Sequence, residues 1–112
     1  MSEARADNPK ALYDEIFELL NSRYDRVASS KMFGVPTLKV KGKAFASLFE
    51  DEMVFKLTGS AHKAALRLSD AKPFDPSGKQ RPMKEWVQVP FAHADKWEVL
   101  AESALKYVAT GN

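Results

Sequence analysis

Six basic side chains near two turn-forming segments are the residues of this chain best suited to bind a charged partner. They are Lys39, Lys41, Lys43, Lys79, Arg81 and Lys84. The first three surround a predicted turn at Gly42, and the other three line a proline-rich segment and the start of the following strand. Lysine and arginine at such positions pair with nucleic-acid phosphates. Lysines also protect exposed sheet positions against pairing with other chains, and we prefer this simpler explanation while the phosphate hypothesis stays open.

No combination of residues predicts catalysis or metal binding. The chain has no cysteine, and its two histidines, His62 and His93, are expected to be surface or capping residues. Residues 29–31 place serine beside lysine, but adjacency does not provide the geometry that an activated nucleophile needs. The three acids at residues 50–52 are expected to form a solvated turn. We therefore predict a protein that is not an enzyme and has no catalytic residue, metal ion or cofactor.

Charge is distributed unevenly along the chain, although the net charge is only +2. Residues 1–26 carry four basic and six acidic side chains, residues 27–89 carry eleven and six, and residues 90–112 carry two and three. A basic middle suits an anionic partner, but chance clustering on a solvated surface explains it as well. No apolar run reaches the roughly 18 residues of a membrane helix, and residues 1–10 lack the apolar part of a signal peptide. We expect a cytoplasmic protein without a membrane partner.

Hydrophobic periodicity predicts three helices. The asparagine and proline at residues 8–9 favour a helix start, because asparagine caps free N–H groups and proline lacks one that would need a partner. The first helix is expected over residues 9–25. An alanine-rich face predicts a short second helix at residues 61–70, which Ser60 can cap. The third helix is expected at residues 94–109.

Alternation of apolar and polar residues predicts the strands of an antiparallel sheet. The expected strands lie near residues 27–33, 38–41, 44–50, 53–58 and 84–89. Short turns at residues 41–43 and 51–52 join the central three strands into a meander. In the last of these three strands, the alternation places Val54 on the opposite face from Met53 and Phe55.

These elements predict an α+β domain: an antiparallel sheet of four to five strands with an N-terminal helix, a short middle helix and a C-terminal helix. The helices are expected to cover one face of the sheet and leave the other partly solvated. Residues 1–112 form a single domain, of which residues 1–7 are expected to be a flexible tail. The proline-rich loop at residues 71–83 is long enough to suggest a functional role. Trp86 and Trp97 are expected in the core.

Several short motifs along the chain form a familiar set. They are Met32-Phe33-Gly34, Gly42-Lys43-Ala44-Phe45-Ala46, Met53-Val54-Phe55-Lys56-Leu57, Lys72-Pro73-Phe74 and Arg81-Pro82-Met83-Lys84-Glu85-Trp86-Val87-Gln88-Val89-Pro90. Together they resemble the N-terminal domain of the TfoX/Sxy competence regulators, over residues 12–108 of this chain. Residues 34–43 are also similar to the MmcQ/YjbR group, whose fold has been likened to a double-winged DNA-binding domain. Val35-Pro36 stands where TfoX-like domains usually have a second glycine.

The resemblance implies a non-enzymatic domain of a competence-type or transcription-type regulator, whose partner is a protein or DNA. For a DNA partner, the six basic residues named above are the candidate phosphate contacts. Two alternatives stay open. One is a protein–protein interaction module or homodimer that binds no nucleic acid, and the other is a small-molecule-binding protein with an unrecognised pocket.

Overall fold

The chain folds as an α+β domain, as the sequence predicts. The computed structural model describes residues 8–32, 34–75 and 83–110. Within these ranges, only the backbone is described for Met32, Met83 and Lys84. In chain order the described elements are α1 (Pro9–Arg23), β1 (Val27–Met32), β2 (Val35–Val40), β3 (Lys43–Phe49), β4 (Glu52–Lys56), α2 (Gly59–Leu66), β5 (Lys72–Phe74), β6 (Met83–Val89), the 3-10 helix η1 (Phe91–His93) and α3 (Ala94–Thr110).

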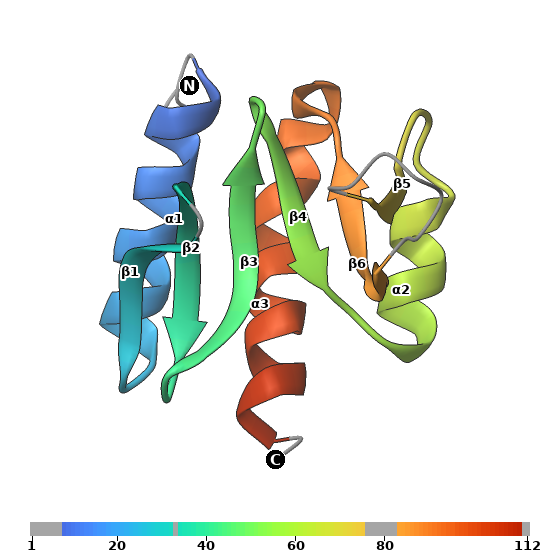
Figure 1. Ribbon diagram of the computed structural model, residues 1–112. Coiled ribbons are helices and arrows are strands. Elements are labelled where there is room, and N and C mark those ends of the chain that lie inside the picture. Colours follow the sequence, from blue (N-terminus) through green and yellow to red (C-terminus); the bar gives the residue numbers. More distant parts are fainter. Residues whose placement is uncertain (1–7, 33, 76–82, 111–112) are drawn as a thin grey trace.

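The described strands form one six-stranded antiparallel sheet in the order β1-β2-β3-β4-β6-β5 (Figure 1). The strand near residues 27–33 is present as β1. The additional strand is β5, which lies inside the predicted loop at residues 71–83. A strand of three residues with Pro73 at its centre is too short and too poor in donors for alternation to reveal it. Residues 76–82 of that loop and the predicted tail at residues 1–7 lie outside the described residues.

The described helices pack on one face of the sheet, as predicted. α3 crosses β2, β3 and β4, α1 lies beside it against β1, and α2 packs on β6 (Figure 1). The large side chains that this packing buries completely include Trp97, Tyr13, Phe45, Phe55, Ile16 and Leu20. Burial of each such side chain contributes about 1.5–3 kcal/mol, so this layer is the main source of stability.

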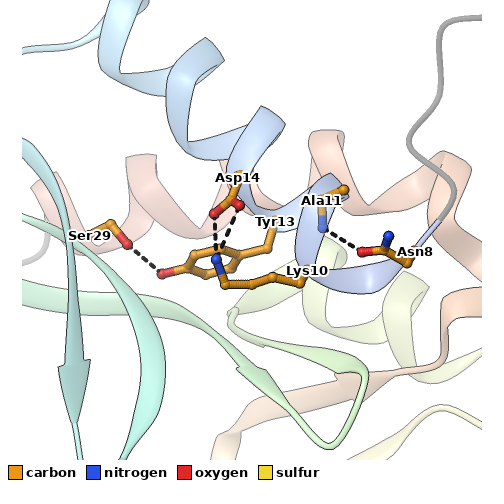
Figure 2. A network of polar contacts seen from close by, with 6 residues as sticks. All are labelled: Asn8, Lys10, Ala11, Tyr13, Asp14 and Ser29. Atoms are coloured by element: carbon orange, nitrogen blue, oxygen red, sulfur yellow. Dashed lines mark hydrogen bonds and ion pairs between the residues drawn. The ribbon is translucent and has the colours of Figure 1, made fainter.

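Helix α1 begins as its sequence predicts (Figure 2). The Asn8 side chain accepts a hydrogen bond from the Ala11 N–H at 2.8 Å, and Pro9 occupies the first helical position. Lys10 forms an exposed ion pair with Asp14 at 3.0 Å one turn later. The helix ends at Arg23, two residues before the predicted end at residue 25, because the next residue is already in extended conformation with φ −130° and ψ 148°.

The middle helix differs more from its prediction. α2 begins at Gly59, so Ser60 lies inside the helix, and the N-cap position belongs to Thr58, whose side chain makes no capping hydrogen bond. The helix ends at Leu66 instead of residue 70, because a turn follows in which Asp70 adopts a left-handed φ of 66°. Helix α3 extends one residue beyond its predicted end.

Two tight turns join the central strands, and both need left-handed backbone. Lys41 and Gly42 connect β2 to β3 with φ of 54° and 82°, and Glu50 and Asp51 connect β3 to β4 with φ of 49° and 68°. The predicted turn at residues 51–52 therefore lies one residue earlier, and Glu52 is the first residue of β4. Two-residue turns with positive φ at both positions suit the twist of a hairpin and favour Asn-Gly.

The acidic turn provides a stability test. Changing Glu50→Asn together with Asp51→Gly is expected to stabilise the domain by about 1–2 kcal/mol, because these residue types tolerate left-handed φ better. The measurement is the midpoint of urea unfolding. A double alanine variant at the same positions removes the same charges but prefers right-handed backbone, so it should not be stabilised. Equal stabilisation of both variants would contradict this explanation.

Candidate nucleic-acid interface

The β2–β3 hairpin carries three of the predicted phosphate-binding residues. Lys39 lies in β2 and is half-buried, whereas Lys41 in the turn and Lys43 at the start of β3 are exposed. The strand expected near residues 38–41 would place Lys39 and Lys41 on one face, but β2 ends at Val40, so Lys41 belongs to the turn. The two exposed lysines flank Gly42 at the tip of a regular hairpin.

A fourth cation, which sequence reasoning missed, lies beside this tip. The Lys41 N–H donates a hydrogen bond to the Arg26 carbonyl oxygen at 3.0 Å, so the residue before β1 lies next to the β2–β3 turn. The Arg26 side chain is exposed. We call Arg26, Lys41 and Lys43 the basic corner. Within the described residues, none of its three side chains has an ion-pair partner.

The other three predicted residues are placed less completely. Lys79 and Arg81 lie outside the described residues. Lys84 lies near the start of β6, and its side chain is not described. β6 runs parallel to β3, because both are antiparallel to β4, so Lys84 and Lys43 lie at the same end of the sheet with β4 between them. The convergence of all six side chains on one surface thus remains a prediction.

The sheet face opposite the helices contains a second packed layer. A row of register partners crosses the whole sheet on this face: Ser30, Thr37, Ser47, Val54, Gln88 and Lys72. We call this the second face. Val54 is 0% exposed and yet is not part of the main core cluster. The expectation of a partly solvated face is therefore too simple, since its centre is buried.

Polar and aromatic contacts close the second face around Val54. The hydroxyl groups of Thr37 and Ser47 are 3.0 Å apart, and the Gln88 side-chain amide donates to a Glu52 carboxylate oxygen at 2.7 Å. Phe49 of β3 meets Phe74 of β5 edge to face with ring centroids 5.0 Å apart. Two strands separate β3 from β5, so the sheet must curl toward this side for the rings to touch.

The sequence of the chain matches a known family over most of its length. The family model of the TfoX N-terminal domain matches residues 18–108, which includes the basic corner and the second face. The chain belongs to the TfoX N-terminal domain family. No curated protein and no solved structure matches it.

Three groups of this TfoX N-terminal domain that could suggest catalysis take part in hydrogen bonds within the fold. The His93 Nε2 atom lies 2.9 Å from the Ser69 carbonyl oxygen, which links η1 to the segment after α2. Ser29, two residues before Lys31, shares a hydrogen bond with the Tyr13 hydroxyl. Glu52 is bound to Gln88 and is half-buried, so the predicted solvated acidic turn contains only its two neighbours. In the described ranges, His, Asp and Glu form no group of three able to hold a metal ion.

Tyrosine hydroxyl groups fix the helices of the TfoX N-terminal domain to the sheet and to each other. Burial raises the pKa of Tyr13, whose hydroxyl meets Ser29 of β1. A hydrogen bond to the Glu102 carboxylate, at 2.6 Å, raises the pKa of Tyr24 and joins the end of α1 to α3.

None of the helices in the described part of the chain is long and apolar enough to cross a membrane.

Proposed function

We propose that this domain is a non-enzymatic regulatory module that binds the phosphate backbone of DNA through its basic corner. The observation that carries this proposal is the hydrogen bond between Lys41 and Arg26, which holds residues from two separate segments at one end of the sheet. Membership of the TfoX N-terminal domain family supports a regulatory role without catalysis.

The electrostatic state of the basic corner favours an anionic partner. Its three side chains are exposed and lack ion pairs among the described residues, so they are free to approach phosphates. Lys56, by contrast, is half-buried and 3.8 Å from Glu85, so its charge is partly compensated. Lys84 lies near the start of β6, at the same end of the sheet. Contacts of this kind bind DNA without reading its sequence.

The backbone at Lys41 supports a functional reason for its charge. Lys41 has φ 54°, at a turn position where asparagine, aspartate and glycine are the preferred residues. A lysine held in left-handed conformation costs about 1 kcal/mol, and such outliers often accompany function. The turn geometry therefore does not account for a lysine at this position, whereas the proposed phosphate contact does.

Salt-dependent binding tests the proposal directly. Fluorescence anisotropy of a mixed-sequence DNA duplex should show binding at low salt that weakens as salt rises. With three phosphate contacts, affinity should fall about 40-fold between 50 and 200 mM salt, since each contact contributes about 0.9 to the logarithmic slope. Absence of binding at low salt would refute the DNA proposal.

A single substitution separates charge from folding. Lys41→Asn places the preferred residue in the turn, so stability should be unchanged or higher, while the salt slope should fall by about 1. Lys96→Gln is the matched control, because Lys96 is exposed near the start of α3, at the opposite end of the sheet from the basic corner (Figure 1). An equal loss of affinity in both variants would show that net charge, and not the basic corner, determines binding.

A further inference from the structure

The two edges of the sheet differ in how they are protected. β5 has three residues, contains Pro73 and shifts register against β6 before Phe74. Short length, proline and irregular register are common devices that prevent edge strands from pairing with other chains. β1 at the other edge has six residues, contains no proline and stays in unbroken register with β2 from Val27 to Met32. β1 carries one lysine, Lys31, which is another such device, but its length and regular register leave this edge able to accept a partner.

The backbone groups of β1 that have no partner in the described part of the chain follow from the ladder with β2. The Arg26 carbonyl accepts a hydrogen bond from Lys41, which directs that carbonyl toward β2. Successive residues of an antiparallel strand turn their N–H and C=O groups to alternate sides. The groups of Val27, Ser29 and Lys31 accordingly point away from β2, toward the outside of the sheet.

We propose that this edge binds β1 of a second copy of the chain, antiparallel and on a two-fold axis through Ser29. Opposite residues of an antiparallel pair lie on the same face, so the axis must pass through a residue and not between two. An axis through Ser29 pairs it with Ser29 of the second copy and pairs Val27 with Lys31. All three outward-facing residues then have partners within the strand. An axis through Ser30 would set Val27 opposite residue 33, beyond the end of β1.

The side chains along β1 suit a copy of the same strand. On the helix side, the Ser29 Oγ atom lies 2.8 Å from the Tyr13 hydroxyl, which holds this small side chain on the axis (Figure 2). Lys31 would lie across from Val27, so that its aliphatic part covers an apolar neighbour and no like charges are opposed. On the second face, Ala28 would meet Ser30, and both are small. If residue 29 carried a charge, it would face the same charge of the second copy and this register would be unfavourable.

The charged side chains of α1 beside this edge form an ion pair, so they present no uncompensated charge to a second copy. Lys10 and Asp14 lie on α1 next to Tyr13, and they neutralise each other at 3.0 Å (Figure 2). The proposed two-fold axis, perpendicular to the sheet, would place both second faces on the same side of one continuous sheet. The proposal of this pairing does not depend on the proposed DNA binding.

Disulfide trapping tests the register, because the chain has no cysteine of its own. In Ser29→Cys, the two cysteines would form a hydrogen-bonded pair with Cα atoms about 5.5 Å apart, which a disulfide can bridge. Mild oxidation should convert most of the protein to a covalent dimer. In the control Ser30→Cys, each cysteine is opposite Ala28, and the two Cα atoms are diagonal neighbours about 7–8 Å apart, at or beyond disulfide reach.

Light scattering of the unmodified chain provides the second measurement. The proposal predicts a mass that approaches twice that of the chain as concentration rises. A monomer at every concentration would overturn it. Equal trapping of both cysteine variants would indicate random collision, and trapping of Ser30→Cys alone would indicate another register. Either result refutes the proposal.

Discussion

Replacing Trp97 by alanine is expected to remove about 3–5 kcal/mol from the free energy of unfolding. The Trp97 side chain is 0% exposed and lies in the core cluster that α3 forms with the sheet. Its indole N–H donates to the Pro90 carbonyl oxygen at 3.2 Å, and its ring meets Phe91 edge to face at 5.4 Å. The substitution therefore leaves a cavity and a ring without its partner, and the Pro90 carbonyl keeps only its hydrogen bond from the His93 N–H.

The expected loss is large relative to the whole stability of a small domain, which is about 5–15 kcal/mol. Urea unfolding followed by circular dichroism measures it, and Trp86 remains as a fluorescent probe. Trp97→Phe is the control, because it keeps one aromatic ring and removes only part of the side-chain volume together with the hydrogen bond, so about 1–2 kcal/mol should be lost. A Trp97→Ala variant within about 1 kcal/mol of the original chain would show that this site is not tightly packed.

The two tryptophans show where periodicity predicts burial in the core and where it does not. Both were expected in the core, and Trp97 lies at a helical spacing that repeats over four turns of α3. Trp86 is half-buried on the second face and outside the core cluster, so the expectation for it was wrong. In a strand, neighbouring residues alternate faces, and sequence alone does not reveal which face the helices will cover.

The same limitation explains the differences in the sheet. The strands with several alternating residues were predicted, and so was the N-terminal cap at Asn8. β5 was missed because a proline and three residues carry no period. The turn at Glu50 and Asp51 was misplaced by one residue, because glutamate and aspartate indicate left-handed backbone less clearly than glycine or asparagine would.

The candidate site was predictable in its local part only. The lysines around Gly42 are neighbours in the sequence, and a hairpin holds them together wherever it lies in the fold. Arg26 joins them through a backbone hydrogen bond between segments fifteen residues apart, which only the pairing of β1 with β2 creates. No charge pattern in the sequence could have indicated this contact. The roles of all the basic residues in binding stay predictions.

A buried charge at Val54 is expected to have an effect comparable to the loss of Trp97. Val54 lies at the centre of the second face, between Ser47 and Gln88 in the register, and is 0% exposed. Val54→Asp would place a carboxylate between Glu52 and Lys56 on the same strand face, and the Lys56 ammonium already lies 3.8 Å from Glu85. A poorly compensated buried charge costs about 3–5 kcal/mol, so this variant should lose about that much of its free energy of unfolding.

Two comparisons make the Val54 result specific to burial. Val54→Thr has almost the same shape and adds only a hydroxyl group, so it should cost about 1–3 kcal/mol. Burial raises the pKa of an aspartate in the folded state above its unfolded value, so the extra cost of Val54→Asp should shrink as pH falls through the folded pKa. Urea midpoints between neutral and acidic pH measure both effects. If Val54→Asp were as stable as Val54→Thr at neutral pH, the centre of the second face would be open to water, and an open centre would make that face, not the basic corner, the first surface to test for a ligand.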